Sequence, residues 1–185
     1  MTTTDKDIDL SALFTRLDAC HEARKWAAGK TLEQAWNECP RGDWLLWLAG
    51  RLDVDRKLLV RAACQCARLA LPHVPAGELR PLKSIEAAEA WTRGEATIED
   101  VRAAADAAWA AAWAASTAAG AASAAANAAR AAEEEAWAAA CAAAWTAAGA
   151  WGAALTSKFA ECAEIVREHV SYELIAEAAR REAAK

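Results

Sequence analysis

The chain has 185 residues, enough for one domain with a sizeable core and too few to require two. Hydrophobic residues make up 56% of it and are mostly alanine, while ten tryptophans supply most of its large aromatic rings. The net charge of −5 argues against a general nucleic-acid binder and against a protein drawn to anionic membranes.

Helix signals begin near the N-terminus. Asp9 or Ser11 opens a predicted helix that continues to about Gly29, a residue suited to the left-handed position after a helix. Residues 31–34 read Thr-Leu-Glu-Gln, a capping box that predicts a short second helix carrying Trp36.

A turn at residues 39–43 contains a proline and a glycine and separates the second helix from a third. Asp43 is predicted to cap this third helix, with Arg41 on the exposed side of the cap. Trp44 and Trp47 are three residues apart and therefore share one helical face. We expect one of these rings to be buried and the other to be partly exposed.

The fourth predicted helix is amphipathic and extends from about Asp55 to Leu71, where a proline stops it. Its apolar side chains fill one arc, and the opposite side is expected to face solvent. That side carries Lys57, Arg61, Cys64 and Arg68. Residues 51–83 hold seven basic and three acidic side chains, a net charge of +4, so this basic stripe could bind a small anion.

A loop at residues 73–79 precedes two further helices. Pro81 suits the first turn of a helix that Gly94 ends, and Thr97 starts the next one. From residue 101 to residue 155 the sequence is dominated by alanine, which has the highest helix propensity.

One straight helix over this alanine-rich tract would be roughly 80 Å long, which is improbable for so small a chain. The poorest helix formers lie between residues 120 and 127, so we predict a turn there and an antiparallel helical hairpin. The hairpin would place Trp109 and Trp113 beside Trp137 and Cys141.

A last helix is expected from about Thr156 to Val170, and the residues after Ser171 extend it or form another helix. Its predicted apolar face consists of Phe159, Cys162, Ile165 and Val166.

No segment has the alternating pattern of a strand, so we predict an all-α fold, a compact bundle of about seven to eight helices. We expect a single domain over residues 1–185. Its parts are the amphipathic helices and the CPRGDWLLWL turn (1–95), the alanine-rich hairpin (96–155) and the C-terminal helix (156–185).

The expected location is the cytoplasm. The first residues lack the basic and apolar regions of a secretion signal, and the alanine-rich tract carries charges that oppose membrane insertion. Six cysteines without such a signal indicate reduced thiols. We therefore expect a soluble protein with neither a membrane nor a nucleic acid as partner.

The sequence contains no convincing catalytic set, so we expect no enzyme and no cofactor. Cys64 and Cys66 lie two residues apart on a helix and point about 200° from each other, which prevents them from chelating one metal ion. Cys39 is the most tempting nucleophile, because a position before a helix lowers a thiol pKa. No histidine is placed beside it by the sequence.

Two groups of residues are candidate binding sites. Tryptophan and arginine dominate binding hot spots, and the first group is Arg41, Asp43, Trp44 and Trp47, a predicted site for a protein partner. The second group would hold an anion or a nucleotide and consists of Lys57, Arg61, Arg68, Arg80 and Lys83, with Trp44 or Trp47 stacking on a base.

Three segments resemble immunity proteins of bacterial polymorphic toxin systems, an alanine-rich helical family that also occurs in phage and prophage settings. They are residues 31–48 (TLEQAWNECPRGDWLLWL), 59–68 (LVRAACQCAR) and 89–97 (EAWTRGEAT), followed by the alanine-rich tract. The tract carries tryptophan where many relatives carry tyrosine. The resemblance implies a small helical inhibitor that binds a cognate toxin, and it assigns no binding residues.

Three hypotheses follow. In the first, the protein is a non-enzymatic immunity or counter-defence protein that neutralises a protein toxin or defence effector by direct binding. In the second, it is a nucleotide-binding sponge that sequesters a phosphorylated immune signalling molecule through the basic stripe. In the third, it is a structural helical module that forms homo-oligomers through the alanine–tryptophan hairpin.

Overall fold

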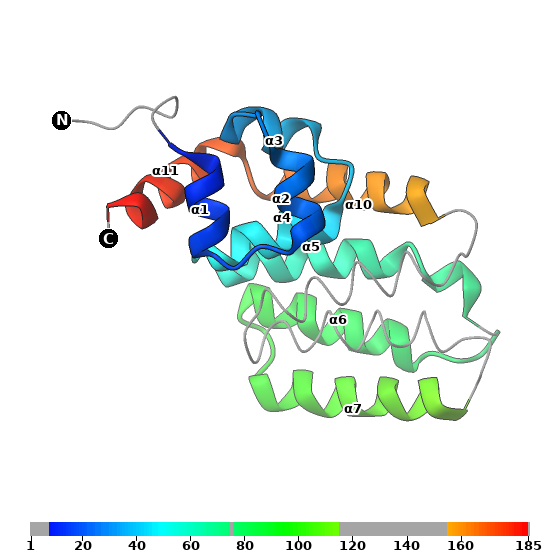
Figure 1. The fold of residues 1–185 in the computed structure, drawn as a ribbon. Helices are drawn as coiled ribbons and strands as arrows, with labels where there is room; N and C mark the ends of the chain where they lie inside the picture. The colour runs from blue at the N-terminus through cyan, green and yellow to red at the C-terminus, as the bar shows by residue number, and fades with distance from the viewer. Residues whose placement is uncertain (1–7, 75, 115–154, 185) are drawn as a thin grey trace.

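The computed structural model describes residues 8–74, 76–114 and 155–184. These ranges contain nine α-helices, one short 3-10 turn and no strand, which confirms the predicted all-α class for this part of the chain (Figure 1). The α-helices are α1 (Leu10–Arg16), α2 (His21–Ala27), α3 (Leu32–Glu38), α4 (Gly42–Arg51), α5 (Arg56–Arg68), α6 (Arg80–Arg93), α7 (Ile98–Ala114), α10 (Leu155–His169) and α11 (Tyr172–Ala183), and the 3-10 turn is Leu71–His73.

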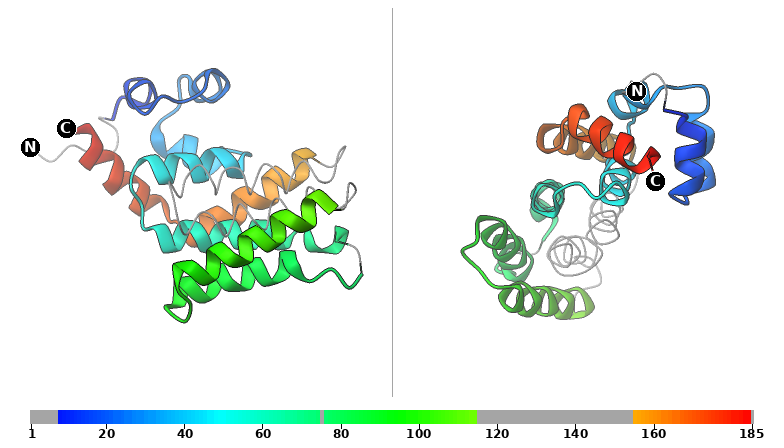
Figure 2. Two further views of the ribbon diagram at one scale, coloured as in Figure 1. Left: turned by 90° about the horizontal axis from the view of Figure 1, so that it is seen from below. Right: turned by 90° about the vertical axis from the view of Figure 1, so that its left-hand side faces the viewer.

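The longer helices pack in a row. Helix α7 packs on α6, α6 on α5, and α10 fits against both α5 and α4 (Figures 1 and 2). The short helices α1 to α3 lie at the α4 end of this row, where α3 contacts α11. Arg16 of α1 also approaches Glu182 of α11, with Nε 3.7 Å from Oε1. Both ends of the described chain therefore support the region around α4.

Several helix ends follow from local chemistry, as predicted. The Asp9 carboxylate accepts a hydrogen bond from the Ala12 amide at 3.0 Å and caps α1. The Thr31–Gln34 capping box is present in both directions, at 3.1 and 2.9 Å. Gly94 ends α6 in the left-handed conformation at φ 79°.

The predicted first helix is wrong in one respect, because it is two helices. Asp18 adopts a left-handed conformation at φ 60°, which aspartate tolerates better than most residues, and the chain turns between α1 and α2. The carbonyl of Leu17 at this break accepts hydrogen bonds from Nε and Nη2 of Arg51, at 3.0 and 2.7 Å. A side chain 34 residues away thus satisfies the end of α1.

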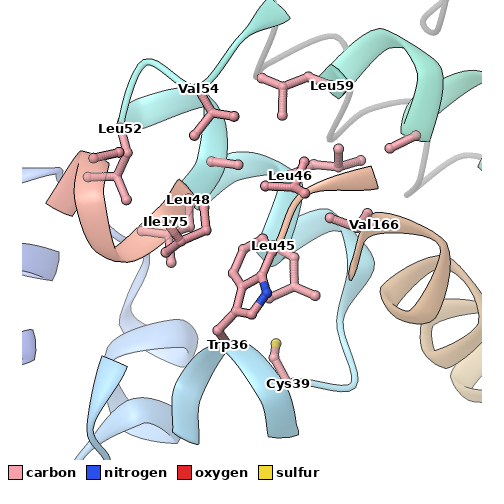
Figure 3. Close-up of a cluster of buried hydrophobic side chains, with 14 of the residues drawn as sticks. Trp36, Cys39, Leu45, Leu46, Leu48, Leu52, Val54, Leu59, Val166 and Ile175 are labelled. Atoms are coloured by element: carbon pink, nitrogen blue, oxygen red, sulfur yellow. The ribbon is translucent and has the colours of Figure 1, made fainter. Parts of the chain in front are cut away.

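Trp36 is the centre of the core beside α4. Its side chain is 1% exposed, and Figure 3 shows its indole pointing from α3 toward Leu45, Leu48 and Ile175. These residues come from α4 and α11, so the ring joins α3 and α4 to a helix near the other end of the chain. The predicted short helix at Trp36 is confirmed.

Arg167 of α10 donates hydrogen bonds to carbonyl groups at the C-terminal end of α3. Its Nε donates to the Trp36 carbonyl at 3.0 Å and its Nη2 donates to the Cys39 carbonyl, while Nη1 pairs with Glu164 at 2.8 Å. The last carbonyls of a helix have no partner within the helix. A distant guanidinium therefore holds a helix of seven residues in place.

We expect Arg167→Met to lower the free energy of unfolding by about 2 kcal/mol, because it leaves both carbonyls of α3 without their charged donor. Urea unfolding followed by circular dichroism measures this change. Glu164→Gln is the control, since it removes the exposed ion pair and keeps both carbonyl bonds. Equal unfolding midpoints for the two variants would contradict this role for Arg167.

The C-terminal helices are close to those expected. Helix α10 buries Phe159, Cys162 and Val166, whereas Ile165 is only half-buried, and α11 is a separate helix after Ser171. The predicted turn between residues 120 and 127 lies outside the residues that the structure describes, as do Trp137 and Cys141, the predicted partners of Trp109 and Trp113. None of the described helices combines the length and the apolar character needed to cross a membrane.

Candidate functional site

The turn before α4 differs from the prediction in how it is capped. Arg41, not Asp43, occupies the N-cap position, and Gly42 is the first helical residue. Asp43 lies in the first turn with its side chain 9% exposed and accepts two hydrogen bonds from Arg41, at 2.8 Å from Nε and 2.6 Å from Nη2. The carboxylate binds a guanidinium because its position inside the helix turns it away from the capping geometry.

Arg41 is held on two aromatic rings instead of lying free on the surface. Its Cζ atom is 4.7 Å from the centre of the Trp44 ring and 4.2 Å from that of Phe159. The side chain is 25% exposed. Burial acts to lower the pKa of Arg41, but the hydrogen bonds to Asp43 and the negative charge of its carboxylate together outweigh this effect and raise the pKa. Arg41 therefore fixes the position of Trp44.

Both tryptophans of α4 are half-buried, so the expectation of one buried and one partly exposed ring is wrong. The ring centres of Trp44 and Trp26 of α2 are 6.2 Å apart, with an interplanar angle of 59°. The ring centres of Trp47 and Phe14 of α1 are also 6.2 Å apart, with an interplanar angle of 81°. Both geometries are favourable for aromatic pairs. Each indole is thus anchored at one edge and keeps another edge available.

The two indoles line a shallow hollow between α2 and α4. Its volume is about 140 Å³, and its walls are Cys20, Ala23, Asp43, Trp44 and Trp47. Ala23 has a short side chain, so α2 extends little into the hollow. The site therefore offers aromatic edges around a space of about the size of one side chain.

Close packing of α10 supports this site from behind. A Cβ atom added to Gly42 would lie 2.6 Å from Cys162 Cβ and within 2.8 Å of backbone atoms of Cys162 and Ala163. Only glycine allows this approach. The same helix carries Phe159, which stacks on Arg41.

The basic stripe of α5 faces α6, and the prediction that this side faces solvent is wrong for Cys64. Cys64 is fully buried, with its sulfur 3.9 Å from the Ile85 carbonyl. Arg68 donates two hydrogen bonds to Glu89, at 2.8 and 2.7 Å, and Arg61 donates to Thr92 at 3.3 Å. Lys57 and Arg61 are exposed as predicted and Arg68 is half-buried, whereas Cys64 is buried because α6 covers that flank of α5.

The structure also shows the surroundings of the other three cations of the predicted anion site. Lys57 lies over the Trp91 ring at 6.0 Å, Arg80 pairs with Glu78, and Lys83 is exposed on α6. Hydrogen bonds from Arg80 lower the Glu78 pKa to about 2. An anion binding to this group would have to displace carboxylates from Arg68 and Arg80.

The thiol of Cys39, the most tempting nucleophile in the sequence, has a raised pKa. Burial raises its pKa to about 11, and its sulfur donates to the Arg41 carbonyl at 3.6 Å. Desolvation outweighs the proximity of the helix start. Within the described ranges, no three His, Cys, Asp or Glu side chains gather in a group that could hold a metal ion.

His169 ends α10 with a buried Nε2 atom that has no hydrogen-bond partner among the described residues. Burial lowers its pKa below 6.5 and nearby Arg61 lowers it further, while Glu168 acts in the opposite direction.

The unfolded chain therefore binds a proton at a higher pH than the folded protein does, so acidification favours unfolding. We expect the unfolding free energy to fall as the pH drops below about 6.5, where the histidine of the unfolded chain titrates. Unfolding titrations of His169→Leu should lose this component, and His21→Gln, at an exposed position, should keep it. Identical pH profiles for the wild type and His169→Leu would contradict the assignment.

Sequence reasoning missed the residues that position the two indoles, namely Phe14, Cys20, Ala23, Trp26 and Phe159. They come from three other helices. The aromatic residues among them were visible in the sequence, but nothing in their spacing indicated contact with α4.

Comparison of the chain with models of known families, with curated proteins and with solved structures gives no match.

Proposed function

We propose that this protein is a non-enzymatic immunity or counter-defence protein that neutralises a protein toxin or defence effector by direct binding. The observation that supports this most is the pair of half-buried indoles at Trp44 and Trp47, which flank a hollow and are held from behind by aromatic neighbours. Rigid, partly exposed tryptophans are the residues that contribute most to protein interfaces.

The contributions of the four predicted residues differ. Trp44 and Trp47 present the contact surface, because they line the hollow. Arg41 and Asp43 form an ion pair with each other and act mainly by fixing the Trp44 ring. A partner is therefore expected to insert an apolar or aromatic side chain between the indoles.

The resemblance to immunity proteins of polymorphic toxin systems supports the same proposal. The other hypotheses have weaker support. Three of the five cations that a nucleotide would need, Arg61, Arg68 and Arg80, are engaged with Thr92, Glu89 and Glu78. The hairpin proposed for oligomerisation lies outside the described residues.

The test is co-expression with the products of neighbouring toxin genes, read out as rescue of cell growth, followed by calorimetry on any pair that rescues. Trp44→Ala and Trp47→Ala should each weaken binding by about 30-fold or more, equivalent to about 2 kcal/mol. Trp91→Ala is the matched control, since this ring is also half-buried but lies on α6.

Loss of binding in both α4 variants with retained binding in the control would support the proposal. A partner that binds all three variants equally would overturn the assignment of the surface. Absence of rescue by the wild type against every neighbouring toxin, together with a thermal shift caused by a nucleotide, would favour the second hypothesis.

A further inference from the structure

Cys66 of α5 and Cys162 of α10 form a buried thiol pair. Both residues are 0% exposed, and the Cys66 sulfur lies 3.9 Å from the Cys162 carbonyl oxygen. Gly42 of α4 closes the space behind Cys162. The Cys66 side chain therefore contacts Cys162 at the packed interface of α5 and α10.

The other described cysteines point elsewhere. Cys64 faces the Ile85 carbonyl on the opposite flank of α5, and Cys39 faces the Arg41 carbonyl. Cys20 is exposed beside the α4 tryptophans. Among the cysteines in the part of the chain that the structure describes, Cys66 and Cys162 are in direct contact across two packed helices.

We propose that Cys66 and Cys162 are a redox-modification site, at which a small-molecule disulfide such as oxidised glutathione converts the two thiols into an intramolecular disulfide between α5 and α10. In the first step, the thiolate of one cysteine attacks the glutathione disulfide, forms a mixed disulfide and releases one glutathione. The second cysteine then attacks the protein sulfur of the mixed disulfide, which releases the other glutathione. The two protein thiols lose their protons, and the two glutathione thiols gain them.

Burial of both cysteines in the folded protein restricts when this reaction can occur. Proximity of the Cys162 thiol and burial raise the Cys66 pKa, so the Cys66 thiol is protonated in the folded protein, and both thiols are shielded from solvent. Reaction with a disulfide therefore occurs while α10 is separated from α5, during folding or local opening. A reducing environment leaves the pair as thiols.

The bond would stabilise the part of the fold that supports the candidate site. It joins residues 96 positions apart, and cross-links that close long loops restrict the unfolded chain most. Helix α10 also supplies Phe159 to Arg41 and Arg167 to α3. Oxidation should therefore raise the resistance of this region to denaturation.

The experiment refolds the full chain in buffers of increasing oxidised-to-reduced glutathione ratio, followed by alkylation in denaturant, thiol counting and peptide mapping. The wild type should fall from six free thiols to four, with the peptides of Cys66 and Cys162 joined. The urea midpoint of the oxidised form should be higher than that of the reduced form, and a reductant should reverse the shift.

Cys64→Ala is the matched control and should retain the cross-link, whereas Cys162→Ala should lose it. The proposal is overturned if all six thiols persist in the most oxidising buffer, or if another pairing predominates in the wild-type peptide map. It is also overturned if the cross-linked form unfolds at the same or a lower urea concentration. The wild-type map decides the pairing even if Cys162→Ala fails to fold.

Discussion

Trp36→Ala is expected to lower the free energy of unfolding by about 3–5 kcal/mol, the largest single effect in this protein. The ring is fully buried at the junction of α3, α4 and α11, and its removal leaves a cavity that the surrounding helices cannot close. A loss of this size is a large part of the stability of a domain of this length. Urea unfolding followed by circular dichroism measures it.

The control for this prediction is Trp91→Ala, which removes the same side chain from a half-buried position beside Lys57. We expect a clearly smaller loss there, because less area leaves contact with the core. If the two variants unfold at the same urea concentration, Trp36 does not have the central role that the structure gives it. A molten Trp36→Ala protein with retained helical signal would instead agree with that role.

Gly42→Ala is expected to cost about 3 kcal/mol, at the upper end of the range for overpacking. The added methyl group would lie 2.6 Å from Cys162 Cβ and 2.7 and 2.8 Å from two backbone atoms of α10. Because backbone atoms cannot rotate away, α10 has to move off α4. The gain in helix propensity from alanine is at most about 1 kcal/mol and does not offset this cost.

The movement of α10 provides a second measurement for Gly42→Ala. Amide hydrogen exchange in α10 should become faster around Cys162, and partner binding through Trp44 should weaken as Phe159 shifts from Arg41. Asn37→Ala on the exposed face of α3 is the control and should change neither property. Unchanged exchange in α10 would show that the helices are less closely packed than the structure indicates.

The sequence predicted those features of the fold that depend on local interactions. The cap at Asp9, the capping box at Thr31 and the left-handed Gly94 each involve groups within a few residues of one another. Helix propensity and apolar spacing act over the same short range, so the all-α class and most helix boundaries could be derived before the structure.

The candidate site was predicted only in part. The sequence identified Trp44 and Trp47 as neighbours on one face of a helix, since a spacing of three residues determines that. It assigned Asp43 to the wrong capping role and left Arg41 on the surface. The guanidinium of Arg41 also stacks on Phe159 of α10, a residue far along the chain that no local pattern connects to it.

The sequence by itself determined where helices form in the described chain, because backbone hydrogen bonds and caps are local. Only the tertiary structure decided which helix faces are covered. Cys64 and the basic stripe of α5 face α6, Arg167 completes α3, and Cys66 meets Cys162. Each of these contacts joins residues more than 20 positions apart, and no local pattern specifies which distant side chain fills a given space.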